Sequence, residues 1–496
     1  MSSRSMSRLV SASAVAFGMA CLVSPLAGQG QAPAAAPSAA EQALIARAKA
    51  IHERVITLDT HDDISPNNFT PDCNYTMRLT TQVNLPKMKE GGLDVSFMIA
   101  YVGQGELTPE GYADAYRQVT AKFDAVHRLT EQIAPNEIGL ALTPADVVRI
   151  AKSGKKVAVI GIENGYPIGE DLERVKEFWT RGGRYMSLAH NGHSQLADSN
   201  TGEANDQWLH KGLSDLGKKV IAEMNRWGIM VDISHPSKQA NLQAIALSKA
   251  PVIASHSAAR ALANHSRNLD DEQLEAVKKN GGVVQTVAFA SYVKVEDPAI
   301  TTARQQAIAA VNQQFGVAAA PAAGGGRGGG GGGGRGAGRG EGTPTPCPVE
   351  DPNNPNAGRG GRGGGGGGGG GRGGGVNADA LAALSPERRA EYDKRLAAVQ
   401  AQYPPMARAT VKDFVNHIDY LVKKIGIDHV GISSDFDGGG GIDGWNSAAE
   451  SFNVTVELVR RGYTEEQIGK IWSGNLLRVW AEVEKVAKDI QAGKIK

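Results

Sequence analysis

Short apolar runs alternate with amphipathic stretches along most of the chain. The runs are rich in valine and isoleucine, as expected of parallel strands that helices cover on both faces. Several stretches between them open with helix-start chemistry, for example Thr143-Pro144-Ala145-Asp146 and Thr464-Glu465-Glu466-Gln467. Eight runs are predicted to be strands: Val55–His61, Leu93–Val102, Lys156–Glu163, Tyr185–His190, Gly228–His235, Pro251–Ser257, Gly282–Phe289 and His429–Asp435.

This alternation of strands and helices indicates an α/β fold with a parallel sheet. Eight strand–helix units favour a closed (β/α)8 TIM-like barrel over an open, doubly wound sheet. The hydrophobic fraction of 41% suits a globular domain with a sizeable core. We predict that the barrel occupies residues 43–490.

The N-terminus has the pattern of a secretory signal. Arg4 and Arg8 precede an apolar run from Leu9 to Leu26. A membrane anchor is the alternative, since the run is near the lower length limit for a span. Its Ser, Ala and Gly content favours cleavage, so we predict a signal peptide over 1–28 and a flexible linker over 29–42. The mature protein would then be periplasmic, in the cell envelope or secreted, without membrane association.

A glycine- and arginine-rich tract follows the seventh predicted strand. Residues 318–376 are predicted to be a disordered insert within the barrel domain, flanked by helical segments near Thr301–Phe315 and Asn377–Gln402. Ser385-Pro386 would kink or restart the second of these helices. The arginines also allow a reading as a cell-envelope or RNA-binding protein. The net charge of +1 gives no overall attraction to nucleic acid, and no nucleic-acid partner is expected.

Signal cleavage would leave two cysteines, Cys73 and Cys347. An oxidising compartment permits a disulfide between them. Sequence alone does not bring them within bonding range, so two free thiols remain the alternative.

Metal-capable side chains end six of the eight predicted strands. In a barrel of this kind all strand C-termini open onto one face, where active sites lie. Each residue alone has a structural explanation, as a hydrogen-bonded histidine or a helix-capping aspartate. Together they suit zinc or a similar divalent ion. The set comprises His61, Asp63, Glu163, His190, His235, His256 and Asp435.

Several ordered motifs resemble the membrane (renal) dipeptidases, a family of zinc dipeptidases, and in particular an exported bacterial member. The similarity runs from about Val55 to Trp480 and is broken mainly by the Gly-rich insert. The motifs are LDTHDDIS, VIGIENGYPIG, GGRYMSLAHNGHSQLADS, GIMVDISHPS, PVIASHSAARALANHSRNLDDE, HVGISSDFDG, QVNLPKMKEGGLDVSFMIAY and GYTEEQIGKIWSGNLLRVW.

The resemblance implies the metal-dependent hydrolase type of barrel, with two Zn²⁺ per chain. His61 and Asp63 would bind one zinc, His235 and His256 the other, and Glu163 both. The chain would then hydrolyse dipeptides through a metal-bridged hydroxide, including those with a D-residue at the C-terminal position.

Three further roles follow from the same resemblance. His190 would polarise the scissile carbonyl, and Asp435 would act as a general base at the reaction centre. Arg267 would hold the substrate's C-terminal carboxylate, whereas without the resemblance it would be a surface arginine paired with Asp270 or Asp271.

Two departures from the family pattern concern the residues after Glu163. Asn164 and Tyr166 stand where relatives usually have a glycine and a histidine, which affects the expected substrate preference. The second hypothesis is an amidase or lactonase of the wider group of metal-dependent barrels, acting on N-acyl amino acids or related small substrates. A homodimer is also expected from the resemblance.

Overall fold

The computed structural model describes residues 38–318, 346–351 and 376–495. Its parallel strands have the spatial order β1-β2-β4-β5-β6-β7-β8-β9. A further short strand, β3, lies off this series and pairs with β4. The strands are β1 (Leu58–Asp63), β2 (Val95–Tyr101), β3 (Ile138–Leu140), β4 (Lys156–Glu163), β5 (Gly183–Ser187), β6 (Met230–Asp232), β7 (Ile253–Ser257), β8 (Val283–Val287) and β9 (Val430–Ser433).

The sheet closes where β9 returns to β1. Asp62 bridges Phe436 in parallel, and the backbone N–H of Asp63 donates to the carbonyl of Phe436 at 2.8 Å. Adjacent pairs along the whole series are parallel, as helix-containing crossovers require. The predicted (β/α)8 barrel is confirmed.

All eight predicted strands exist, but five of them stop short of the residue predicted to end them, and in three this leaves a predicted site residue outside the strand. β5, β6 and β9 finish before His190, His235 and Asp435, which lie in the loops that follow. The ninth strand, β3, was not predicted because it is only three residues long and lacks a distinct apolar run.

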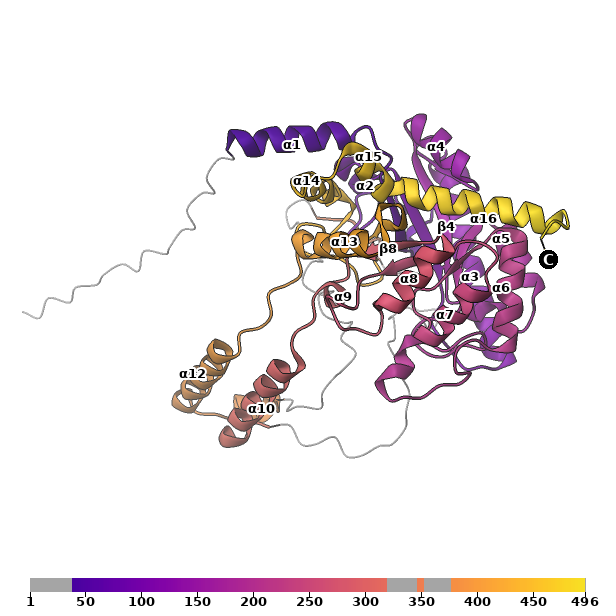
Figure 1. Ribbon diagram of the computed structural model, residues 1–496. Coiled ribbons are helices and arrows are strands. Elements are labelled where there is room, and N and C mark those ends of the chain that lie inside the picture. Colours follow the sequence, from indigo (N-terminus) through magenta and orange to yellow (C-terminus); the bar gives the residue numbers. More distant parts are fainter. Residues whose placement is uncertain (1–37, 319–345, 352–375, 496) are drawn as a thin grey trace, which may run out of the picture. The chain divides into compact units, whose positions relative to one another are not determined.

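Helices surround the strands, as Figure 1 shows. Helix α4 begins at Pro144 because the Thr143 hydroxyl accepts the backbone N–H of Asp146 at 3.1 Å, as its sequence predicts. The helices of the barrel are α2 (Leu85–Gly91), α3 (Pro109–Arg128), α4 (Pro144–Lys152), α5 (Glu173–Thr180), α6 (Asp215–Trp227), α7 (Lys238–Leu247), α8 (Asp271–Asn280), α9 (Ala290–Val293), α13 (Val411–Ile425), α14 (Phe452–Arg460), α15 (Glu465–Gly469) and α16 (Asn475–Gln491).

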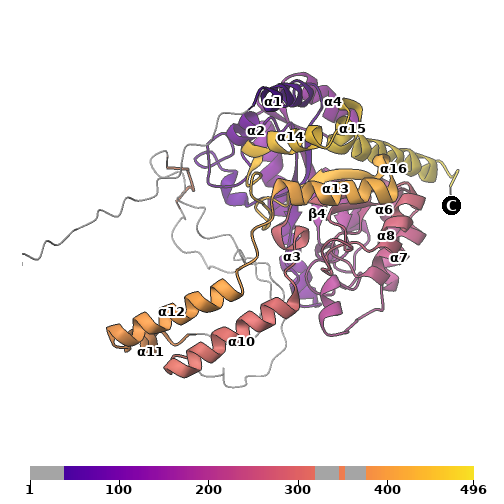
Figure 2. The ribbon, with the colours of Figure 1, turned by 60° about the vertical axis from the view of Figure 1, so that its left-hand side comes forward.

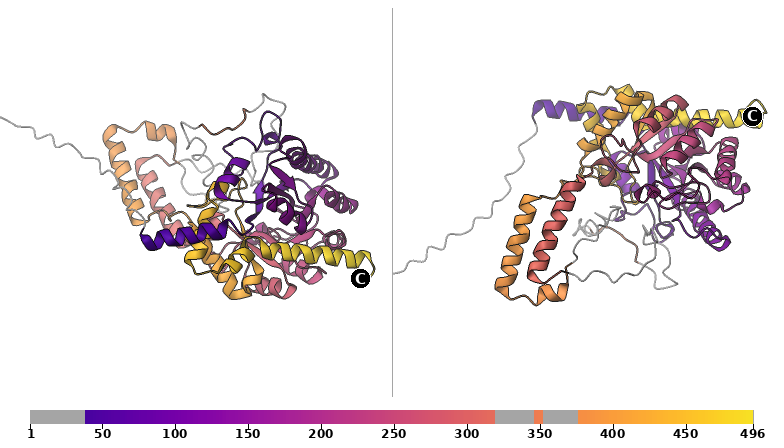
Figure 3. Two further views of the ribbon diagram at one scale, coloured as in Figure 1. Left: turned by 90° about the horizontal axis from the view of Figure 1, so that it is seen from above. Right: turned by 60° about the horizontal axis from the view of Figure 1, so that its bottom comes forward.

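The barrel interior is filled and closed at the amino ends of the strands. Phe97 and Tyr185 stack inside it with ring centroids 5.7 Å apart. Trp480 and Val483 of α16 join the same core, together with Val283 near the start of β8. Helix α16, the yellow helix that leads to the C-terminus in Figure 3, packs against α6. Only the carboxyl ends of the strands are therefore left for a site.

Gly161 in β4 makes room for the Tyr185 ring, which a Cβ at this position would overlap. We expect Gly161→Ala to lower the free energy of unfolding by about 1–3 kcal/mol, because the ring must move within a packed core. Urea denaturation measures the change. Gly469→Ala is the control: its Cβ would meet only Val55 Cγ1 at 3.6 Å, so stability should stay within about 1 kcal/mol of wild type or rise. Equal effects of the two changes would contradict the packing argument.

The first described helix is α1 (Ala39–His52), so the predicted linker 29–42 is helical from Ala39 onward. The predicted signal peptide, 1–28, lies outside the described residues. None of the helices in the described ranges is long and apolar enough to span a membrane.

The segments flanking the Gly-rich insert form helices, as predicted. They are α10 (Pro298–Phe315), α11 (Ala378–Ala382) and α12 (Pro386–Gln402). Figure 2 shows α10 and α12 side by side. Phe315 and Tyr392 pack between them, and Ser385 caps the restarted helix α12. Residues 319–345 and 352–375 of the predicted insert lie outside the described part of the chain.

Residues 346–351, which interrupt the glycine- and arginine-rich tract, contact the barrel, although the whole insert was predicted to be disordered. Residues 346–351 are attached to the loop before α2, because Cys347 forms a disulfide with Cys73. Val349 pairs with Leu79, and the Glu350 carboxylate lies 2.7 Å from the ammonium of Lys87. The bridge, which the sequence left open, is formed.

We expect reduction of the Cys73–Cys347 disulfide to lower the free energy of unfolding by about 2–4 kcal/mol, since it links positions 274 residues apart. Urea unfolding with and without a thiol reductant measures this difference. The Cys347→Ser variant should already be weakened and should not respond to the reductant. A wild-type protein equally stable in both buffers would show that the bridge contributes nothing.

Candidate active site

Glu163, the last residue of β4, stands at the centre of four imidazoles. Its Oε1 lies 2.9 Å from Nε2 of His235 and 3.4 Å from Nε2 of His256. Its Oε2 lies 3.5 Å from Nε2 of His61, and Nε2 of His190 is 3.8 Å from Oε1. The carboxylate is 3% exposed. Each of its two oxygens therefore faces a different group of histidines.

His235 and His256 reach this point from neighbouring strands. Their Nε2 atoms are 3.0 Å apart, so both ring nitrogens converge on one position. His235 lies in the loop after β6 with φ +82°, in the left-handed region that non-glycine residues rarely adopt. Such local strain is typical of functional sites, where it is retained because it aims the side chain.

Asp63 and Asp435 bring two carboxylates together beside His61. Both lie against Gly438, where a Cβ would overlap their oxygens. Asp435 also has a left-handed backbone, with φ +59°. A glycine at 438 is thus required for the close approach of the loop after β9 to β1.

The donor atoms form three overlapping groups that fit divalent cations. In each group the ligand atoms lie within 4.8 Å of one another. Among the described residues, His61 Nε2 and Asp63 Oδ1 are buried without a hydrogen-bond partner, which is costly unless something binds them. Imidazole nitrogens and carboxylate oxygens bind zinc and similar divalent ions. The groups are His61, Glu163 and His256; Glu163, His190 and His235; and His61, Asp63 and Asp435.

The charges of this cluster are unbalanced without a cation. Burial, with Glu163 and Asp63 nearby, raises the pKa of Asp435 to about 8, although His61 opposes the shift. Burial and then Glu163 raise the pKa of Asp63 to about 6. Burial alone would lower the pKa of His61, but the carboxylates, Glu163 first, raise it to about 10. Carboxylates that compete in this way for positive charge make a receptor for cations.

The histidines are held by partners on their other ring nitrogens. The Tyr185 hydroxyl lies 2.8 Å from Nδ1 of His61, and the Ser255 hydroxyl lies 2.8 Å from Nδ1 of His256. Ser255 in turn donates to Asp232, a buried carboxylate, at 2.6 Å. Such outer contacts fix the ring orientation and leave Nε2 free to bind a cation.

His190 lies at the edge of the cluster, beside Tyr101 at the end of β2. The Tyr101 hydroxyl lies 3.3 Å from Nδ1 of His190, and the ring centroids are 4.6 Å apart. Burial lowers the pKa of His190 to about 4, although Glu163 opposes the shift. In its neutral form His190 adds no positive charge that would repel cations, and it can exchange a hydrogen bond with a polar group.

Arg267 is buried close to the cluster, at 3% exposure. Its guanidinium donates to the backbone carbonyl of His256 at 3.1 Å and lies over the Tyr292 ring. It makes no ion pair with any described residue, and its Nε has no hydrogen-bond partner there. The alternative pairing is absent, because Asp270 binds Lys238 and Asp271 binds Lys424. Arg267 is thus available for an anion.

The structure brings all eight predicted site residues to one end of the barrel, and it adds others that sequence analysis missed. Tyr101 and Tyr185 are aromatic residues within apolar strand runs and therefore look like ordinary core. Of these residues only Asp232 had a signal in the sequence, because it lies three positions before His235 in the motif GIMVDISHPS.

The departures after Glu163 have a local explanation. Asn164 has φ +73°, a conformation that glycine adopts freely and asparagine tolerates. Its amide donates to the Val102 carbonyl at 3.1 Å. The hydroxyl of Tyr166 donates to the Glu106 carbonyl at 2.5 Å, so these two residues fix the loop after β2.

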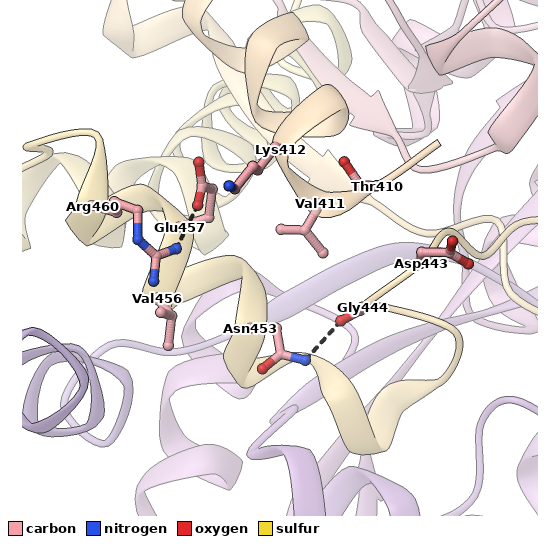
Figure 4. A pocket seen from close by; sticks show the side chains of 9 residues that line it. All are labelled: Thr410, Val411, Lys412, Asp443, Gly444, Asn453, Val456, Glu457 and Arg460. Atoms are coloured by element: carbon pink, nitrogen blue, oxygen red, sulfur yellow. Dashed lines mark hydrogen bonds and ion pairs between the residues drawn. The ribbon is translucent and has the colours of Figure 1, made fainter. Parts of the chain in front are cut away.

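A hollow of about 440 Å³ between α13 and α14 offers no comparable chemistry (Figure 4). Its two carboxylates are already paired, Asp443 with Arg408 and Glu457 with Arg460 and Arg461. No histidine lines it.

Relatives with solved structures share this barrel. The probable dipeptidase PvdM from Pseudomonas aeruginosa is 29% identical, with a TM-score of 0.65 over 90% of this chain and 100% of that one. A metallo peptidase from Rhodobacter sphaeroides, solved with a phosphinate mimic of L-Ala-D-Ala, is 19% identical, with a TM-score of 0.56 over 86% of this chain and 99% of its own.

Sequence comparison gives the family. Dipeptidase tcpJ from Claviceps purpurea is 25% identical over 83% of this chain and 72% of its own length. Dipeptidase aclJ from Aspergillus oryzae is 26% identical over 88% and 80%. The family model of the membrane dipeptidases, Peptidase family M19, matches residues 45–494. The chain therefore belongs to the membrane dipeptidase family and is a metal-dependent hydrolase that acts on the peptide bonds of dipeptides.

Proposed function

We propose that this enzyme uses two zinc ions and accepts dipeptides with either an L- or a D-residue at the C-terminal position. The observation that most strongly supports two ions is the position of Glu163. Its Oε2 faces His61, whereas its Oε1 faces His235 and His256. A carboxylate whose two oxygens face separate donor groups is suited to bridge two cations.

The chain's own donors divide into two sets around that bridge. His61 and Asp63 would hold one cation, and His235 and His256 the other. When bound, such cations supply Lewis acidity, which makes water more acidic and polarises a carbonyl.

The remaining side chains would position the substrate and move protons. Arg267 would bind the C-terminal carboxylate through its guanidinium, which supports a cut one residue from that end. His190 would donate a hydrogen bond to the scissile carbonyl oxygen as negative charge develops there. Asp435, which lies beside His61 and Asp63, would take a proton from the attacking water and pass it to the leaving amine.

Two observations support the wider proposal. The Rhodobacter sphaeroides neighbour was solved with a mimic of L-Ala-D-Ala, which is why we include D-residues. The Cys73–Cys347 disulfide suits an oxidising compartment, which supports export to the periplasm, the cell envelope or the medium. We also propose a homodimer, the expected state of the family.

Metal analysis combined with a substrate panel tests the proposal. We expect two zinc ions per chain and hydrolysis of L-Ala-L-Ala and L-Ala-D-Ala. The His235→Ala variant should lose one ion and most of the activity. One ion or fewer in the wild type, or full activity in His235→Ala, would contradict the two-ion site. Turnover of N-acetyl-alanine without turnover of either dipeptide would instead support the amidase hypothesis.

A further inference from the structure

Lys122 lies beside the site, although neither motif nor strand position pointed to it. It belongs to the inner face of α3, between Val119 and Val126, which are fully buried. That spacing of three and four residues places the three side chains on one side of the helix. The Lys122 ammonium lies 5.3 Å from the ring centroid of Tyr101, the residue that contacts His190.

The Lys122 ammonium forms no hydrogen bond or ion pair with any residue that the structure describes. Two other lysines removed from water are paired: the buried Lys87 binds Glu350 at 2.7 Å, and the partly buried Lys156 binds Asp94 at 3.1 Å. Removing a lysine partly from water without a partner is costly, and burial accordingly lowers the pKa of Lys122. A lysine left in this state beside a site is available to a ligand.

Lys122 and Arg267 lie on opposite sides of the metal-binding cluster. Tyr101 ends β2, whereas Arg267 follows β7, and these strands are four places apart in the ring of eight. Glu163 ends β4, between them. A dipeptide whose carboxylate binds Arg267 would therefore extend its N-terminal residue toward Tyr101 and Lys122.

The cluster does not need Lys122 for charge balance once it is loaded. Two divalent cations bring four positive charges, which the three carboxylates of Asp63, Glu163 and Asp435 and one metal-bound hydroxide would already balance. Lys122 adds a further positive charge on the side where a dipeptide carries its ammonium. Lys122 would repel a basic side chain on the substrate's N-terminal residue and attract an acidic one, whereas a neutral side chain would gain nothing from its charge.

We propose that Lys122 is a specificity-determining residue that binds a carboxylate on the side chain of the substrate's N-terminal residue, so that the preferred substrates are dipeptides beginning with glutamate or aspartate. This inference rests on the proposed function, because it takes the substrate's orientation from Arg267.

Glutamate and glutamine have the same shape, so L-Glu-L-Ala and L-Gln-L-Ala isolate the charge. On the zinc-loaded enzyme we expect kcat/KM for L-Glu-L-Ala to be roughly 10- to 100-fold higher, mainly through a lower KM, as for a hydrogen bond between charged groups. In Lys122→Met the ratio should fall to about 1, with kcat/KM for L-Ala-L-Ala unchanged or higher. In Lys122→Glu the preference should shift to L-Lys-L-Ala.

Arg117→Gln is the matched control, since it removes one positive charge from the exposed face of the same helix. It should leave the Glu/Gln ratio as in wild type. Equal kcat/KM for the two substrates in wild type, or a preference that persists in Lys122→Met, would overturn the inference. Failure of the wild type to hydrolyse any dipeptide would refute the proposed function itself, and hydrolysis of L-Ala-L-Ala without a Glu/Gln difference would refute only the role of Lys122.

Discussion

Glu163→Gln should abolish both metal binding and catalysis, with kcat/KM lower by at least about 1,000-fold. The amide keeps the shape of the side chain, but it removes the negative charge that faces His61 on one side and His235 on the other. Metal-ion catalysis contributes several kcal/mol of charge stabilisation, which sets this magnitude. Elemental analysis of the purified protein, measured together with kcat and KM, separates loss of metal from loss of chemistry.

Glu457→Gln provides the matched control for this change. Glu457 is equally buried, at 3% exposure, but it pairs with Arg460 and Arg461 away from the site. Its loss should lower stability and leave the zinc content and KM as in wild type. A Glu163→Gln protein that retains two zinc ions and more than a tenth of wild-type activity would refute the bridging role of this carboxylate.

The barrel could be predicted because its strands are buried on both faces. Such strands produce continuous apolar runs, so each strand can be recognised in the sequence. The ends of the strands could not be predicted in the same way. Strand β6 stops at Asp232, whereas the apolar run continues through Ile233 toward the loop residue His235. Hydrophobicity marks burial, whereas strand ends depend on backbone pairing, which burial alone does not set.

The convergence of the metal-capable residues was predictable for a geometric reason. Carboxyl ends of parallel strands meet at one face, so residues as distant in sequence as His61 and Asp435 become neighbours. Histidines on helices follow a different pattern. His52 and His417, for example, bind the backbone carbonyls of Gly91 and Val293 and are ordinary buried side chains.

Features that depend on tertiary contacts could not be predicted. The Cys73–Cys347 bridge joins residues 274 positions apart across the Gly-rich tract, and nothing local to either cysteine indicates the other. Lys122 occupies a position of α3 that the helical pattern assigns to the buried face, yet its environment depends on Tyr101 from β2. In each case the decisive partner belongs to another element.

Arg267→Met should raise KM for L-Ala-L-Ala by about 100-fold, with a smaller effect on kcat. The guanidinium is buried, has no anionic partner among the described residues and lies next to His256. An arginine that binds a carboxylate through two hydrogen bonds contributes strongly to affinity, and removing one partner of such a buried pair typically costs about 2–5 kcal/mol. Steady-state kinetics on the zinc-loaded enzyme measures the change.

The amide L-Ala-L-Ala-NH₂ distinguishes carboxylate binding from a structural role of Arg267. Wild type should discriminate against this substrate, whose C-terminus is uncharged, by about the same factor that the mutation costs, and Arg267→Met should treat the two substrates alike. If Arg267 only holds the His256 carbonyl in place, both substrates lose equally in the variant and the discrimination persists. Arg184→Met is the control: Arg184 is also buried, but at the amino end of β5 it donates to the Leu142 and Trp179 carbonyls, so its loss should weaken the fold without changing the preference for the free carboxylate.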